Sequence, residues 1–192
     1  MFAVVLDTCV LWPSLQRDFL LSLAVEGLYR PLWSERILEE LEMHEAAKRV
    51  GRGTEQQAAH AFARNLIDRM TSAFDDALVE NWQPHEGTFG LPDPDDEHVL
   101  AAAVVGGAGA VVTHNVRDFP RNRVPHHIQI LEPAQFAADT VSVSPQTALL
   151  AVETMAARFH HPPMSVAQVL RMLADRYAMG AAVDLICTDS GR

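Results

Sequence analysis

The alternation of short apolar runs with segments of helical periodicity constrains the fold more than any other feature of this sequence. Residues 2–6 form an apolar run that ends at Asp7, and two similar runs lie at 110–113 and 128–131. Runs of this length are typical of strands that are buried on both faces of a sheet. Because helical patterns separate them, they indicate βαβ units and a mainly parallel sheet.

Four helical patterns lie between or beside these strands, with apolar residues on one face of each. They span residues 10–28, 34–50, 55–74 and 97–105. Ser34 is the predicted N-cap of the second helix, and Asp95 or Asp96 that of the fourth, which ends at Gly106-Gly107. A further short strand is predicted at 78–82. The stretch 84–94 contains several Gly and Pro residues and is predicted to be a loop.

The chain is predicted to divide near residue 140. Its 192 residues are enough for one globular domain with an appended element. The stretch 139–146 contains Ser, Thr and Pro, and beyond it residues 147–158 and 165–177 have amphipathic helical patterns. We therefore predict an α/β domain over residues 1–140 and a helical extension over 141–192.

Composition narrows the environment and the partners. The formal charge of −10 argues against a sequence-independent DNA coat, which is normally basic. Two cysteines at opposite ends of the chain exclude a Cys-x-x-Cys zinc site and fit a reducing compartment. The longest nearly apolar run, 99–112, is 14 residues long, whereas about 18 or more are needed to span a bilayer. We expect a cytoplasmic protein without membrane contact.

Acidic and amide side chains lie close to the predicted strand ends. Asp7 ends the first strand, and Asn115 and Asp118 lie just past the end of another. Asp96 opens the helix that precedes that second strand. Functional residues of open parallel sheets gather beyond the carboxyl ends of the strands, so these four side chains would meet at one edge. Convergent side-chain oxygens are the ligands of a hard cation such as Mg²⁺.

Each of these residues also has a purely structural interpretation. Asp7 would cap the helix that follows it. Asp96 belongs to the acidic stretch 93–96, where negative charge favours a helix N-terminus. Asn115 and Asp118 are residue types that favour turns.

The predicted 34–50 helix carries three glutamates near its middle. Its apolar stripe is centred on Ile37, Leu38 and Leu41. Glu39 points away from this stripe and is expected to be solvated, whereas Glu40 and Glu42 flank it. Helix geometry leaves Glu40 and Glu42 equally able to reach a pocket, and an ordinary charged rim explains both.

Four stretches together resemble a PIN-domain ribonuclease. They are 4–11 (VVLDTCVL), 33–41 (WSERILEEL), 93–103 (DPDDEHVLAAA) and 111–119 (VVTHNVRDF). Their order and separation match the family and cover the chain to about residue 135. Within the family the chain is similar to the VapC-type toxins of bacterial toxin–antitoxin pairs. The segment from about 145 to 185 is similar to a helical C-terminal extension carried by one VapC subgroup.

The resemblance implies a PIN-like three-layer α/β/α fold with a mainly parallel central sheet, plus a C-terminal helical extension. It places the family's first three acids on Asp7, Glu40 and Asp96, which makes Glu42 the weaker candidate. Many family members have Asp where this chain has Asn115. Either Asp118 supplies the fourth charge, or a second metal site is weak.

The resemblance also implies an activity, which is Mg²⁺- or Mn²⁺-dependent hydrolysis of RNA phosphodiester bonds. The acids and Asn115 or Asp118 would hold one or two ions, and Thr113 would orient the neighbouring acids through its hydroxyl. The flanking phosphates would be held by a group of arginines that otherwise forms a solvated basic turn: Arg117, Arg121 and Arg123. The family further implies a cognate antitoxin that covers the site, and often a toxin homodimer.

Two other interpretations compete with this one. The first is a catalytically silent PIN-like module that docks a protein partner, which the neutral Asn115 favours. The second is a phosphatase with an aspartyl nucleophile after the first strand. Such phosphatases usually carry another Asp two residues later, where this chain has Cys9.

Overall fold

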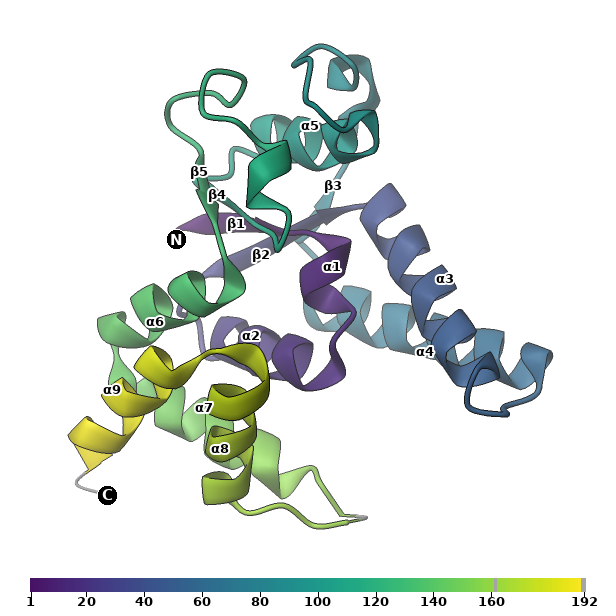
Figure 1. The fold of residues 1–192 in the computed structure, drawn as a ribbon. Coiled ribbons are helices and arrows are strands. Elements are labelled where there is room, and N and C mark those ends of the chain that lie inside the picture. Colours follow the sequence, from purple (N-terminus) through teal and green to yellow (C-terminus); the bar gives the residue numbers. More distant parts are fainter. Residues whose placement is uncertain (161, 191–192) are drawn as a thin grey trace. The chain divides into compact units, whose positions relative to one another are not determined.

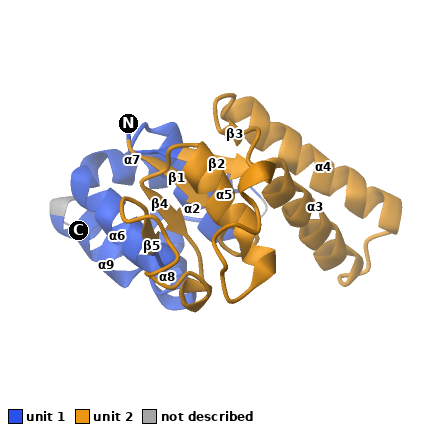
Figure 2. Cartoon of the chain, turned by 90° about the horizontal axis from the view of Figure 1, so that it is seen from above, with its two compact units in different colours: residues 1, 13–30, 131–192 blue, residues 2–12, 31–130 orange. Residues whose placement is uncertain are grey.

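A computed structural model describes residues 1–160 and 162–190 of the chain (Figure 1). The chain forms two compact units, which Figure 2 shows in different colours. We call residues 2–12 and 31–130 the sheet unit, and residues 1, 13–30 and 131–192 the helical unit.

Five strands form a sheet in the order β3-β2-β1-β4-β5. Their bounds are β1 Ala3–Leu6, β2 Arg30–Ser34, β3 Leu78–Val79, β4 Ala110–Val112 and β5 Gln129–Leu131. β1 pairs with β4 in parallel, with Val5 opposite Val111, and β2 pairs with β3 in parallel. Parallel pairing puts the carboxyl ends of β1 and β4 at the same edge of the sheet, as the sequence predicts. β3 is shorter than predicted and is followed by Asn81, whose φ of 60° is outside the strand region.

The sheet unit contains four α-helices and three short 3₁₀ helices among its described residues. These are α1 Thr8–Leu11, α3 Glu35–Val50, α4 Gln56–Ala73, α5 Glu97–Val105, η1 Gln83–His85, η2 Pro94–Asp96 and η3 Val116–Asp118. The predicted cap of α3 is confirmed, since Ser34 Oγ accepts a hydrogen bond from the Ile37 amide at 3.3 Å. α3 and α4 pack against each other, and α5 packs on β1 and β4. The apolar residues 99–103 of α5 are fully buried, which makes this helix part of the core.

The helical unit contains the remaining helices of the described residues. They are α2 Ser14–Val25, α6 Pro133–Val143, α7 Pro145–Ala157, α8 Val166–Tyr177 and α9 Gly180–Ser190. α2 packs on α7, while α6, α7 and α8 pack on α9. The two helices predicted at 147–158 and 165–177 are confirmed as α7 and α8, and a capping box between Ser165 and Gln168 starts α8.

Two features of the helical unit differ from the sequence analysis. The pattern predicted as one helix over 10–28 is divided into α1 and α2, because Pro13 cannot continue a helix. The predicted boundary near residue 140 lies inside α6. The division into domains 1–140 and 141–192 stays a prediction. No helix within residues 1–160 and 162–190 is both long enough and apolar enough to cross a membrane.

Candidate active site

A cavity of about 350 Å³ lies within the sheet unit. The predicted site residues that line it are Asp7, Glu40, Asp96 and Asn115. The other lining residues are Thr8, Cys9, Trp12, His44, Asp95 and His98. Residues that are up to 108 positions apart in the sequence thus meet at one cavity, because β1 ends there, α5 begins there and the middle of α3 lies beside it.

The sheet holds the backbone of Asp7, and neighbouring side chains hold its carboxylate. Its amide donates to the Val112 carbonyl at 3.1 Å, which continues the β1–β4 pairing by one residue. Its carboxylate makes no capping hydrogen bond to α1, so the capping interpretation of Asp7 is wrong. Instead, Oδ2 accepts from Thr113 Oγ1 at 2.6 Å and from Cys9 Sγ at 3.0 Å. Asp7 is only 5% exposed.

Thr113 and Cys9 hold this carboxylate in one orientation. The Thr113 hydroxyl accepts from the Asn115 amide at 2.9 Å, which leaves its proton directed at Asp7. Burial and the negative charge of Asp7 raise the pKa of Cys9 to about 12, although its contact with Thr113 and the hydrogen bond from the His114 amide act in the opposite direction. Cys9 is therefore a neutral thiol donor. An orienting role for Thr113 is predicted from the sequence, whereas the donor role of Cys9 is visible only in the structure.

Glu40 is surrounded by donors. Oε2 accepts from Thr8 Oγ1 at 2.7 Å, while Oε1 lies 3.4 Å from Arg36 Nε and 3.3 Å from His98 Nε2. Burial alone would raise the pKa of Glu40, but the hydrogen bonds from His98 and Thr8 and the charges of His98 and Arg36 lower it to about 2. Glu40 is thus an ionised carboxylate whose charge the protein itself compensates.

The pKa of Asp96 is shifted in the opposite direction from that of Glu40. The predicted N-cap position of Asp96 at α5 is confirmed, but its side chain makes no capping hydrogen bond. Within the acidic stretch, Asp93 provides a cap by accepting from the Asp95 amide at 3.0 Å. Asp96 Oδ2 is buried and has no hydrogen-bond partner among the residues that the structure describes. Burial, followed by the negative charges of Asp7, Asp93 and Asp118, raises the pKa of Asp96 to about 7.

These observations bear on whether the cavity fits a metal ion. In the described part of the chain, no three His, Cys, Asp or Glu side chains are already grouped as a complete metal site. The donor chemistry does fit a hard cation, because carboxylate and amide oxygens line the cavity and one buried carboxylate oxygen has no partner. Asp7 and Asp96 would hold a divalent cation, whose charge would oppose the repulsion that adds to burial in raising the pKa of Asp96.

The other predicted residues follow β4. The Asn115 carbonyl accepts from the Asp118 amide at 2.9 Å, so the backbone forms this turn while the Asn115 side chain faces the cavity. Asp118 is partly buried and does not line the cavity, but its charge acts on Asp96. The structure therefore does not choose between Asn115 and Asp118 as the fourth ligand.

The three arginines behave differently from one another. Arg121 donates to the carbonyls of Ile128 and His126 at 3.0 and 3.1 Å, so its guanidinium holds its own loop together. Arg117 and Arg123 are exposed and form no ion pair with other described residues. Arg117 and Arg123 thus keep the free cationic groups that phosphate contacts require, whereas Arg121 has a structural task as well.

Sequence reasoning missed the network that supports the loop before Asp96. The Arg36 guanidinium that contacts Glu40 also pairs with Glu86, and it lies 3.6 Å from Asp95. Glu97 is buried and accepts hydrogen bonds from the amides of residues 89 and 91, at 3.1 and 2.7 Å. These contacts tie the 83–96 loop to α3 and α5. The charged residues Arg36 and Glu97, each next to an apolar run, were the available signal.

Comparisons with known proteins agree with this geometry. Residues 3–117 match the model of the PIN domain family, and residues 133–184 match the VapC50 C-terminal domain. A curated protein of Mycobacterium tuberculosis (strain ATCC 25618 / H37Rv), named "Putative ribonuclease VapC50", is 31% identical over 88 residues. That alignment covers 45% of this chain and 52% of the relative, so the match spans about half the length of the relative. No solved structure matches the chain. The predicted resemblance and the predicted α/β/α fold class with C-terminal helices are confirmed.

Proposed function

We propose, from the premise that this chain belongs to the PIN domain family, that it is an endoribonuclease that depends on Mg²⁺ or Mn²⁺. We further propose that it is the toxin of a type II toxin–antitoxin pair. The observation that carries the proposal is the shared position and the missing ion pairs of Asp7 and Asp96. Both carboxylates face one cavity, and neither is paired with Lys or Arg among the described residues. Burial, together with the negative charge of Asp7, raises the pKa of Asp96.

Asp7 and Asp96 would hold the metal ion, and Glu40 with Asn115 or Asp118 would complete the set, partly through water. When bound, the ion would lower the pKa of a water molecule and neutralise charge that develops on the phosphate. Thr113 and Cys9 act on Asp7 Oδ2 and thereby keep the other oxygen of this carboxylate free.

RNA would approach the cavity beside the loop that follows β4. We propose that Arg117 and Arg123 contact the phosphates that flank the cut, since both guanidinium groups are exposed. Arg121 would position this loop through its two carbonyl contacts and would add to the positive charge. Phosphate contacts of this kind fix the position of a strand without reading its sequence.

The test is cleavage of a structured RNA pool by the purified, antitoxin-free chain with Mg²⁺, with Mn²⁺ and with EDTA. Asp7→Asn and Asp96→Asn should abolish cleavage, and EDTA should do the same. Asp68→Asn is the matched control, because Asp68 is exposed on α4 and outside the cavity. Cleavage that survives in EDTA or in the Asp7 and Asp96 variants would refute the proposed site.

We also propose a cognate antitoxin that carries a basic side chain into the cavity, since two uncompensated carboxylates would accept a cation. Mixing the two proteins in equal amounts should stop cleavage, and unchanged cleavage would contradict inhibition at this site. A homodimer is a further expectation from the family, which analytical ultracentrifugation checks directly.

The second candidate function is a catalytically silent PIN-like module that docks a protein partner. Two observations favour it. Asn115 is neutral at a position where many family members have Asp, and both Glu40 oxygens already have protein donors. A folded wild-type chain that cuts no RNA with either metal would favour this module over the nuclease.

A further inference from the structure

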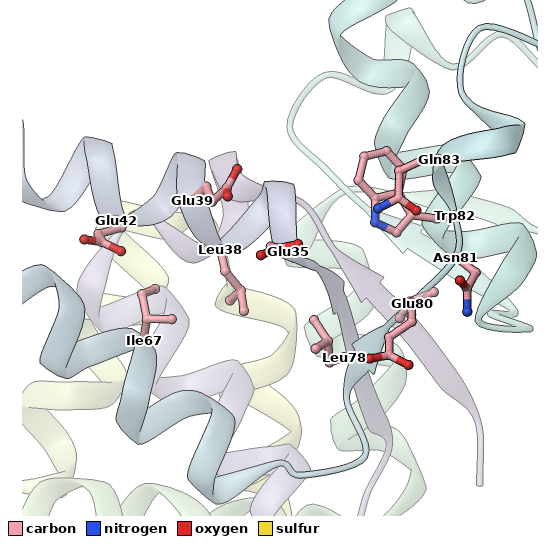
Figure 3. Close-up of a pocket in the computed structure, with 11 residues that line it drawn as sticks. Glu35, Leu38, Glu39, Glu42, Ile67, Leu78, Glu80, Asn81, Trp82 and Gln83 are labelled. Carbon is pink, nitrogen blue, oxygen red and sulfur yellow. The ribbon is translucent and has the colours of Figure 1, made fainter.

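A second groove lies in the sheet unit on the other face of α3. Its volume is about 720 Å³, and it is bounded by α3, α4, β3 and the residues that follow β3 (Figure 3). At 100° per residue, Glu35, Glu39 and Glu42 lie on one face of α3, whereas Glu40 and His44 face the active-site cavity. The groove and the cavity are therefore separate sites that share one helix as a wall.

The groove combines an apolar floor with an acidic rim. Figure 3 shows Leu38, Ile67 and Leu78 between α3, α4 and β3. Leu78 is 44% exposed, a large value for a leucine on a strand. Leu78 thus adds exposed apolar surface to a groove whose volume is in the range of ligand-binding pockets.

The rim is strongly and uniformly negative. It carries four glutamates, three on α3 and one directly after β3: Glu35, Glu39, Glu42 and Glu80. Arg64 is the only cation that pairs with any of them among the described residues, at 3.4 Å from Glu42. The other three carboxylates are exposed and have no ion pair there. A rim of this charge repels phosphates, so the groove is not an RNA path.

We propose that this groove binds a basic amphipathic segment of a partner protein. The apolar side chains of the segment would cover Leu78 and its neighbours on the floor, and its Lys or Arg side chains would pair with Glu35, Glu39 and Glu80. Burial of apolar surface provides affinity, while the complementary charges provide specificity and a fast encounter.

The groove is linked to the active site through a short series of contacts. Trp82 lines the groove, and its ring centroid lies 6.0 Å from that of His98. His98 in turn lies 3.3 Å from Glu40. A segment that contacts Trp82 thus occupies a position two side chains away from a proposed metal ligand, without entering the cavity.

The test measures binding of synthetic peptides to the full chain by fluorescence anisotropy. The probe is a labelled peptide with leucine and lysine at helical spacing, and the comparison peptides replace lysine by glutamate or leucine by serine. The groove variant combines Glu35→Gln, Glu39→Gln and Glu80→Gln. Its matched control removes the same charge from exposed acids elsewhere: Asp68→Asn, Asp175→Asn and Asp184→Asn.

The leucine–lysine peptide should bind, and both comparison peptides should bind more weakly. The groove variant should raise the dissociation constant by about tenfold, which is the combined effect of losing three ion pairs. The control should change it by less than about twofold. Leu78→Thr should also weaken binding, and it keeps the preference for a strand. Circular dichroism checks that each variant folds.

Three results would overturn the proposal. Equal losses in the groove variant and in its control would show only general attraction to an acidic protein. A loss in Asp96→Asn, with none in the groove variant, would place the peptide in the active-site cavity. Absence of binding by the leucine–lysine peptide at low salt would remove the docking site altogether. None of these measurements uses RNA cleavage, so they are independent of the proposed function.

Discussion

Replacing Asp96 with Asn should make the metal-free protein more stable at neutral and basic pH. The pKa of Asp96 is raised from its ordinary value of 3.8 to about 7, so the folded state binds this proton more tightly than the unfolded state. The stabilisation that this proton provides is fully present below the pKa of Asp96 in the unfolded state. It is lost as the pH rises toward the pKa of Asp96 in the folded state. Asn resembles the protonated acid and does not ionise, so the variant should escape this loss.

The magnitude follows from the same values. At 1.36 kcal/mol per pKa unit, a pKa raised from 3.8 to about 7 sets an upper limit of about 4 kcal/mol for a fully buried group. Asp96 is partly exposed to the cavity, and solvent screening reduces the effect, so we expect about 1–2 kcal/mol. The difference between variant and wild type should grow between about pH 4 and pH 7 and then stay constant.

Urea unfolding in EDTA, followed by circular dichroism at several pH values, measures this difference. Asp68→Asn on α4 is the control for the loss of one negative charge and should follow the wild type. If Asp96→Asn also follows the wild type over this pH range, Asp96 does not sit in a repulsive cluster of carboxylates. Adding Mg²⁺ at pH 8 should stabilise the wild type but not the variant, since a ligand stabilises only the state that binds it.

Glu40 should show the opposite pH dependence. Its pKa is lowered from 4.5 to about 2, so its contribution to stability is present above pH 4.5 and is lost as the pH falls toward 2. Glu40→Gln should therefore reduce stability at pH 7 and show less further loss in acid. Glu39→Gln is the matched control, because Glu39 is exposed on the same helix and outside the active-site cavity. Equal unfolding curves for the two variants at pH 7 would contradict the contacts of Glu40.

Three further predictions concern the surroundings of the site and the packing of the sheet unit. Thr113→Val removes the hydroxyl that donates to the Asp7 carboxylate and should lower the rate of cleavage by about 10–100-fold. Thermal unfolding checks that the variant folds. Arg36→Gln removes a cation beside Glu40 and should raise the pKa of Glu40 in an NMR titration, whereas Arg64→Gln should not. Gly106→Ala places a Cβ within 2.8 Å of a β3 side chain and should destabilise the fold by about 1–3 kcal/mol in urea, whereas Gly51→Ala meets only ordinary contacts and should not.

The strands and helices were predictable wherever the local pattern was undisturbed. β1, β4, α3 and α5 lie where apolar runs, caps and glycines place them. β2 was missed because Pro31 lies inside it, and a proline demotes a run to a non-strand when the neighbouring strand is unknown. The apolar pattern continues across Pro13, but the helix does not: α1 ends at Leu11, and α2 begins at Ser14 and packs on α7.

The position of the site was predictable, but its electrostatics were not. Asp7 and Asp96 lie near the strand ends, so topology alone predicts that they meet. Their partners come from distant segments, since the contact of Thr113 with Asp7 spans 106 residues and that of Thr8 with Glu40 spans 32. No local pattern indicates which acid receives donors and which does not. For this reason the sequence alone does not exclude the capping interpretation of Asp7, which the side-chain contacts contradict.

The unequal treatment of the acids is the strongest argument that the cavity is functional rather than structural. A carboxylate kept for stability is expected to have hydrogen-bond donors, as Glu40 has from Thr8 and Arg36. Asp96 has a buried oxygen without a partner and a raised pKa, which together destabilise the folded protein. If only the stability of the folded protein mattered, Asn would be favoured over Asp at position 96. A variant that gains stability and loses metal binding would explain why the acid is there, because stability is given up at functional sites.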